Sequence, residues 1–228
     1  KSMFSDKEFS NQINMSGVNS INWARIIAQS VYYFYCYLSV DDNNKPINFS
    51  VPTGNFGDVY AGYLAKKLGL PINKLIVATN QNDILHRAIS KGKYEAEHVS
   101  ETISPSMDIQ IASNFERLIY DLNNHDSSQT LDDMKHIKHN GKYIIDNDKL
   151  KKINQDFLSA RMSEQETLDV IKNTYKKYNM VLDPHTAIGY GAFDKQNLKG
   201  NNIVLATAHP CKFPDAILKA INLKSDLP

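Results

Sequence analysis

Cysteine and unbalanced charge are both scarce in this chain, and each scarcity excludes a class of protein. Only two of the 228 residues are cysteine, Cys36 and Cys211. Two isolated thiols are too few for a disulfide-stapled secreted domain, and their spacing is not that of a metal site. Charge of one sign is also missing, because 26 Lys and Arg residues face 25 Asp and Glu. A chain so nearly neutral gives no indication of nucleic-acid binding.

Long hydrophobic runs are absent as well. The longest apolar region, Ile26 to Val40, is interrupted by Gln29 and Ser30, so we expect a buried helix there and not a membrane span. Residues 1–22 are mostly polar and show no secretory signal. With the two isolated thiols, these features predict a soluble, cytoplasmic protein with neither a membrane nor a nucleic acid among its partners.

Strand and helix patterns alternate along the chain. The pattern predicts strands at 47–51, 74–78 and 202–206, and helices at 23–38, 58–68, 84–90, 114–122, 164–178, 183–193 and 214–221. This alternation predicts an α/β fold with an open, mainly parallel sheet flanked by helices and with helical C-terminal additions. We expect residues 1–18 to be a poorly defined lead-in. Residues 19–228 would form one α/β region, with a polar insertion of weak periodicity at about 123–150.

A glycine-bracketed turn joins the first predicted strand directly to a helix. It consists of Gly54, Asn55, Phe56, Gly57 and Asp58. Strand, tight turn and helix in this order point backbone N–H groups and a helix N-terminus at one small volume, which suits a phosphate. The spacing is neither a dinucleotide fingerprint nor a nucleotide-triphosphate loop, so a single phosphate is expected. The plainer alternative is an ordinary turn in which Gly54 or Gly57 adopts a positive φ.

Two further candidates follow the last predicted strand. Thr207 lies where open α/β sheets place their ligand sites, and its hydroxyl can share one hydrogen bond with a heterocycle nitrogen. The alternative is a plain strand-end threonine. His209 has the chemistry of a general base, or it is only a turn residue before Pro210.

Two polar clusters precede predicted helices. Asp183-Pro-His185-Thr186 offers helix caps with proline in the first turn. Asn19, Asn22 and Arg25 combine two amides with a guanidinium and could hold a second anion, or they serve as an N-cap and a surface ion pair. No Ser-His-Asp arrangement and no metal-ligand spacing is present.

Seven blocks cover almost the whole chain except the first dozen residues and the polar middle region: Asn19-Ser-Ile-Asn-Trp-Ala-Arg-Ile26, Pro52-Thr-Gly-Asn-Phe-Gly-Asp58, Ala78-Thr-Asn-Gln-Asn-Asp-Ile-Leu85, Ser104-Pro-Ser-Met-Asp-Ile-Gln110, Ser113-Asn-Phe-Glu-Arg-Leu118, Leu182-Asp-Pro-His-Thr-Ala-Ile-Gly189 and Ala206-Thr-Ala-His-Pro-Cys-Lys-Phe-Pro214. In this order they resemble the C-terminal part of the threonine synthases, a pyridoxal-phosphate (PLP) dependent family with the tryptophan synthase β-like fold.

The resemblance implies an activity and a cofactor. The reaction is the PLP-dependent conversion of O-phospho-L-homoserine and water to L-threonine and phosphate, a carbon–oxygen lyase reaction acting on phosphates (EC 4.2.3.1). By the same resemblance, Gly54–Asp58 form a cup for the cofactor's phosphate and Thr207 hydrogen-bonds the pyridine nitrogen. Asn19, Asn22 and Arg25 are implied as contributors to the region that binds the substrate.

The chain departs from the family at the Schiff-base lysine. The family carries that lysine in a Phe-Lys-Asp type motif, which is absent here; Phe and Lys meet only in Cys211-Lys212-Phe213-Pro214, part of another block. The resemblance therefore implies no catalytic residue in this chain, with the lysine upstream. We expect the chain to be inactive alone, and to pair with the missing N-terminal segment or with itself. The alternatives are a non-catalytic remnant that binds phosphate or PLP, and another PLP enzyme that eliminates from serine or threonine.

Overall fold

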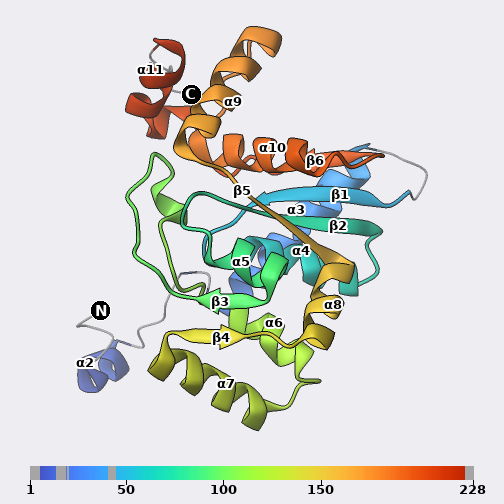
Figure 1. Ribbon diagram of the computed structural model, residues 1–228, viewed down its shortest axis with the longest axis vertical. Coiled ribbons are helices and arrows are strands. Elements are labelled where there is room, and N and C mark those ends of the chain that lie inside the picture. The colour runs from blue at the N-terminus through green and yellow to red at the C-terminus, as the bar shows by residue number, and fades with distance from the viewer. Residues whose placement is uncertain (1–5, 14–18, 20, 41–44, 224–228) are drawn as a thin grey trace.

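Four parallel strands form the centre of the molecule. In the computed structural model, which describes residues 6–13, 19, 21–40 and 45–223, they run in the order β5 (Phe157–Arg161), β2 (Ile72–Thr79), β1 (Ile47–Pro52) and β6 (Asn202–Val204) (Figure 1). The helix α4 (Gly57–Lys67) connects β1 to its neighbour β2. The predicted open, mainly parallel α/β sheet is confirmed.

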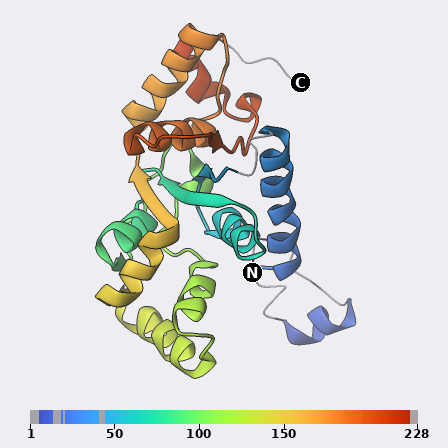
Figure 2. The same ribbon diagram turned by 90° about the vertical axis from the view of Figure 1, so that its right-hand side faces the viewer.

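Helices cover both faces of this sheet. The helix α10 (Pro184–Gln196) lies across one face and contacts all four strands, while α4, α5 (Ile84–Lys91) and α8 (Asn147–Asp156) lie on the other (Figure 1). Beyond α4, farther from the sheet, lies α3 (Trp23–Val40) (Figure 2). The sheet is therefore enclosed between two layers, as parallel sheets require.

Two further helices extend the layer formed by α10. The helices α9 (Glu164–Tyr178) and α11 (Pro214–Ile221) pack on each other, and α9 also packs on α10. Buried apolar side chains from the three helices and the loop before α10 join them, namely Ile171, Leu182, Ala187 and Ile217. The predicted helical C-terminal additions are confirmed, and both α9 and α11 have the predicted bounds.

The strand β1 lies within the core. All six residues of this strand are buried, as expected for a central parallel strand that is covered on both faces. Tyr33 of α3 packs its ring on Phe49 with 5.0 Å between the ring centroids. Gly62 of α4 makes this contact possible, because a Cβ there would collide with the ring of Tyr33. Full burial of side chains such as Phe49 contributes about 1.5–3 kcal/mol each to stability.

A second, smaller layer of structure lies below the sheet in the view of Figure 1. It contains an antiparallel pair, β3 (Lys93–Glu95) with β4 (Lys142–Ile144), and the helices α6 (Phe115–Leu122) and α7 (Ser127–Asn140). The polar region at 123–150 thus holds α7, β4 and the start of α8. Asp126 and Asp146 cap α7 and α8 by accepting hydrogen bonds from backbone N–H groups, which compensates for their weak apolar patterns.

Three elements complete the described chain: α2 (Lys7–Gln12) and the short 3-10 helices η1 (Pro105–Met107) and η2 (Pro210–Lys212). The strand β5 was not predicted, and neither were β3, β4, α7 and α8. Within the described residues, no helix combines the length and the apolar character needed to cross a membrane.

Candidate functional site

The glycine-bracketed turn and Thr207 leave adjacent strands at the same edge of the sheet. Ser50 of β1 pairs in parallel with Val204 of β6, and the backbone N–H of Leu205 continues the ladder by donating to the Ser50 carbonyl at 3.0 Å. The turn begins at Gly54, four residues after Ser50, and Thr207 comes three residues after Val204. This is the carboxyl edge, where open parallel sheets bind their ligands.

Phe56 gives the turn its unusual backbone. It is the N-cap of α4 and adopts the left-handed conformation with φ 65°. The plainer alternative, an ordinary turn with a positive φ at Gly54 or Gly57, was wrong about which residue adopts that conformation. Phe56 is held in this conformation by burial, since its ring is 0% exposed and lies 5.3 Å from Phe115 and 5.8 Å from Phe157 between centroids. Non-glycine residues with positive φ persist where surrounding structure fixes them.

Gly54 is glycine for a different reason, the close approach of another backbone segment. A Cβ on Gly54 would lie 2.6 Å from the carbonyl oxygen of Ser106 in η1. No side chain fits at that distance without a backbone shift. The turn and η1 are therefore packed backbone against backbone.

The N–H groups of the turn are free to bind a ligand, whereas its carbonyls are engaged. Within the described part of the chain, no hydrogen bond joins the backbone N–H groups of residues 54–57 to a protein acceptor. The Asn55 carbonyl accepts from both the backbone N–H and the Nδ2 of Asn114, each at 3.1 Å. The Phe56 carbonyl accepts from the Tyr60 N–H at 3.1 Å. Unpaired donors at a helix N-terminus fit the phosphate of PLP.

Asp58 is anchored to α3 through Tyr33. The Tyr33 hydroxyl donates to the backbone carbonyl oxygen of Asp58 at 2.8 Å, and it lies 3.2 Å from Oδ1 of the Asp58 side chain. Burial raises the pKa of Asp58 to about 6, and the hydrogen bond from Tyr33 only partly opposes this effect. At mildly acidic pH the carboxyl of Asp58, the last residue of the turn, is therefore neutral in a larger fraction of molecules than that of an ordinary aspartate.

Thr207 is exposed and is held through its backbone. Its N–H lies 3.3 Å from Thr186 Oγ1 in the first turn of α10. The Thr186 hydroxyl donates in turn to Asp183 Oδ2. Asp183 is the N-cap of α10, with its Oδ1 accepting from the backbone N–H groups of His185 at 2.9 Å and Thr186 at 3.4 Å. The predicted capping role of this cluster is confirmed.

His185 has contacts that the sequence did not predict. It is 4% exposed, its Nδ1 lies 3.1 Å from Asp183 Oδ1, and its Nε2 lies 3.3 Å from the backbone nitrogen of Ser106. Because a backbone N–H can only donate, Nε2 is the acceptor and Nδ1 carries the proton. Ser106 lies about 80 residues before His185 in the sequence, so no local pattern predicts their contact. The one signal in the sequence was that His185 stands between the capping residues Asp183 and Thr186.

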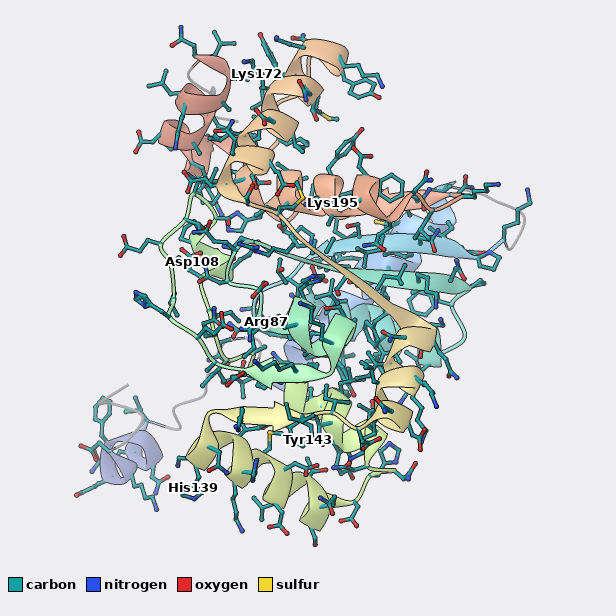
Figure 3. All side chains as sticks on the ribbon, in the orientation of Figure 1. Arg87, Asp108, His139, Tyr143, Lys172 and Lys195 are labelled. Carbon is teal, nitrogen blue, oxygen red and sulfur yellow. The ribbon has the colours of Figure 1, made fainter. Side chains whose placement is uncertain are left out.

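The loop that carries Ser106 is tied to the end of β2. Asp108 Oδ1 accepts hydrogen bonds from Asn80 Nδ2 and Thr102 Oγ1, each at 2.7 Å, and from Asn82 Nδ2 at 2.9 Å. Figure 3 shows Asp108 on this loop beside the sheet. The ends of β1, β2 and β6 are thus joined through η1 and α10.

The chain is similar to threonine synthases in sequence and in structure. Residues 186–228 match the family model described as "Threonine synthase, C-terminal". Over 96% of its length the chain is 43% identical to a threonine synthase of Pseudomonas aeruginosa, and over 97% it is 44% identical to that of Saccharomyces cerevisiae. The crystal structure of PLP-bound threonine synthase from Brucella melitensis matches the entire chain with 46% identity and a TM-score of 0.95. Nearly the whole of this chain thus matches part of a threonine synthase.

The match covers nearly all of this chain but only part of each of these threonine synthases. The chain covers 47% of the Pseudomonas and yeast relatives and 49% of the Brucella chain, so it spans about half of their length. More remote structures share the fold alone; maize serine racemase matches with 13% identity and a TM-score of 0.58.

The remaining candidate site residues lie near the start of α3 and in the block that contains Thr207. Asn19 Oδ1 accepts from the Ile21 N–H in the turn before α3, and Asn22 Oδ1 accepts from the Ala24 N–H in the first turn of α3, each at 3.0 Å. The Asn22 contact is typical of a helix cap. Arg25 follows on the first turn of α3 and is exposed.

In the block that contains Thr207, His209 is exposed and its Nδ1 accepts from the Cys211 N–H at 3.2 Å, as a turn residue would. Lys212 is exposed at the end of η2. No cluster that could hold a metal ion occurs among the described residues.

Proposed function

We propose that this chain is the cofactor-binding portion of a threonine synthase, which converts O-phospho-L-homoserine and water to L-threonine and phosphate. The observation that carries the proposal is the set of unpaired N–H groups of residues 54–57 beside the strand that leads to Thr207. The activity named for the relatives, and the PLP bound in the Brucella threonine synthase, support the choice of activity and cofactor. PLP, when bound, supplies the electron sink for the reaction.

The turn residues Gly54–Asp58 would hold the phosphate of PLP mainly through backbone N–H groups. Those donors and the α4 dipole both stabilise a dianion at this place. The Thr207 hydroxyl would hydrogen-bond the pyridine nitrogen. A neutral hydroxyl there, unlike a carboxylate, leaves that nitrogen largely unprotonated.

The lysine that binds PLP covalently would lie in a segment outside this chain. Lys212 is not assigned to that role, because it is exposed on η2 and belongs to the block that contains Thr207. This chain alone would then be inactive. Asn19, Asn22 and Arg25 stay candidates for the region that binds the substrate phosphate. The two free thiols, Cys36 and Cys211, support a cytoplasmic location.

The activity is tested on two preparations, the protein expressed from its complete gene and the 228-residue chain alone. Each is given PLP and O-phospho-L-homoserine, and threonine and phosphate release are measured. We expect activity from the first and none from the second. Release of threonine by the chain alone would refute the assignment of the lysine. Pyruvate formation from L-serine, without threonine synthesis, would identify another elimination enzyme instead. PLP binding without any product would indicate a non-catalytic protein.

The cup is tested by a pair of substitutions in the protein expressed from its complete gene. Gly57→Val fills space beside the backbone donors, and we expect it to weaken PLP binding by about a hundredfold, the loss of several charge-assisted hydrogen bonds. Asn55→Ala is the matched control, because the Asn55 side chain is exposed and its backbone N–H is retained. Equal affinities for PLP in the two variants, followed by absorbance titration, would refute the cup.

A further inference from the structure

A continuous chain of hydrogen bonds crosses the carboxyl edge of the sheet. It begins at the Ser106 N–H, which donates to His185 Nε2, and continues from His185 Nδ1 to Asp183 Oδ1. From Asp183 Oδ2 it passes to the Thr186 hydroxyl and ends at the Thr207 N–H. Segments that are far apart in the sequence thus meet through side chains of a single helical turn.

The three central members of this chain are buried. Asp183 is 1% exposed, His185 4% and Thr186 5%. Burial by itself raises the pKa of Asp183, but hydrogen bonds from the side chains of His185 and Thr186 outweigh it, and the pKa is lowered. A buried carboxylate that accepts several hydrogen bonds orients its partners strictly, because each alternative arrangement would leave a buried polar group unpaired.

Capping alone does not require this arrangement. The helix α9 in the same molecule is capped by Ser163, which accepts from the Glu166 N–H while Glu166 accepts from the Ser163 N–H. These two hydrogen bonds stay within the first turn of α9, and the other carboxylate oxygen of Glu166 pairs with Lys195 of α10 at 2.7 Å, between partly exposed side chains. The cap of α10 additionally binds the segments of Ser106 and Thr207, so its side chains connect parts of the edge and do more than end a helix.

Both ends of the network lie where the proposed cofactor would bind. At one end is Ser106, whose N–H donates to His185. The carbonyl oxygen of Ser106 faces Gly54 and would lie 2.6 Å from a Cβ added there. At the other end is the backbone of Thr207. A displacement of His185 or Thr186 therefore changes the spacing between the phosphate cup and the Thr207 hydroxyl.

We propose that Asp183, His185 and Thr186 are positioning residues, which hold the phosphate cup and Thr207 at the separation that PLP requires. This inference rests on the proposed function, since it assumes that the cup and Thr207 bind one PLP molecule. None of the three is assigned a contact with PLP. They act through Ser106 and Thr207.

The test compares two buried threonines in the protein expressed from its complete gene. Thr186→Val keeps the shape but removes the hydroxyl that binds Asp183 and Thr207. The matched control is Thr167→Val, because Thr167 is 1% exposed, lies near the start of α9 and donates from its hydroxyl to the Ser163 carbonyl at 2.8 Å. Thr186→Ser keeps the hydroxyl and serves as the rescue. Affinity for PLP is measured by absorbance titration, and stability by urea unfolding of each variant.

We expect Thr186→Val to weaken PLP binding by about tenfold, the effect of a lost buried hydrogen bond. Thr186→Ser and Thr167→Val should bind PLP within about twofold of the unaltered protein. The two valine variants should lose similar stability, so a merely structural role for Thr186 would predict equal PLP affinities for both. Equal affinities would overturn the inference.

A second readout does not depend on PLP. The His185 Nδ1 proton, bound to a buried carboxylate, should give a downfield proton resonance that Asp183→Asn shifts or abolishes and Thr167→Val leaves in place. Persistence of that resonance in Asp183→Asn would also overturn the inference. If the unaltered protein does not bind PLP at all, the proposed function fails, and the inference fails with it. If it binds PLP and Thr186→Val binds equally well, only the positioning role fails.

Discussion

The two sides of the carboxyl edge are held by different forces. The cup follows β1, whose residues are all buried, and it is fixed by packing of Phe56 and Gly54. Thr207 follows β6, whose three residues are only partly buried, and it is fixed by a hydrogen bond to Thr186, 21 residues away in sequence. The turn is therefore held by packing of buried side chains and backbone, whereas Thr207 is held by polar groups.

The largest expected loss of stability comes from removing a packed side chain of the turn. Phe56→Ala should lower the free energy of unfolding by about 3–5 kcal/mol, because a fully buried ring is deleted between Phe115 and Phe157. Chemical denaturation measures this loss. The control Tyr35→Ala removes a ring that is 71% exposed and should change stability by no more than about 0.5 kcal/mol. Similar losses in both variants would show that packing does not hold the cup.

The next effect arises at Gly54. Gly54→Ala forces a Cβ toward the Ser106 carbonyl and should cost about 1–3 kcal/mol of stability by overpacking. It should also weaken PLP binding, because the first residue of the cup moves. Ser106→Ala is the control: it keeps the carbonyl and removes only an exposed hydroxyl group, so it should be neutral within about 0.5 kcal/mol. A tolerated Gly54→Ala would disprove the backbone contact.

The effect of Asp58 depends on pH. Its pKa is about 6 in the folded protein against 3.8 for the unperturbed group, so the folded state holds the proton more tightly than the unfolded state. The stability that Asp58 contributes is therefore full below about pH 4 and is lost as the pH rises through 6. Asp58→Asn removes this dependence. Its stability relative to the unaltered protein should rise by about 2 kcal/mol between pH 4 and 7, and a constant difference across that range would contradict the raised pKa.

The smallest effect on stability is expected on the polar side. Thr207→Ala removes an exposed hydroxyl and keeps the backbone N–H that binds Thr186. The free energy of unfolding should therefore change by less than about 0.5 kcal/mol. If Thr207 binds the pyridine nitrogen as proposed, the absorption band of bound PLP should nevertheless shift, because that hydrogen bond is lost. A large loss of stability, or an unchanged band, would remove the contrast between the two sides.

Much of the fold could be predicted, because its strands and helices have strong local patterns. The helix α9 ends with Tyr178 and α11 begins with Pro214, both as predicted. The strand β5 escaped prediction, since it is five residues long, follows α8 without a break and contains Ser159 and Arg161 on an edge. The helix α7 escaped because Thr130 is its only buried residue and just a few apolar side chains, such as Met134 and Ile137, pack against the core, so its sequence carries a weak amphipathic signal.

The site could be predicted only where one short segment determines it. The turn at Gly54–Asp58 was recognisable from its glycines. Asp183 was recognisable as a helix cap because it precedes a proline. The positive φ at Phe56 was not recognisable, because Phe115 and Phe157 impose it from distant parts of the chain. The contacts of Asn114 with Asn55 and of His185 with Ser106 likewise join residues more than fifty positions apart, which no local pattern reveals.

The most direct test of the central claim is a titration with PLP followed by amide proton and nitrogen resonances, on the protein expressed from its complete gene. If the turn is the phosphate cup, the amide signals of Gly54, Asn55, Phe56 and Gly57 should shift most, because their N–H groups gain an acceptor that they lack within the described chain. The amide of Gly69, which lies at the far end of α4, should stay in place. Saturable PLP binding that leaves the four turn amides unshifted would contradict the account.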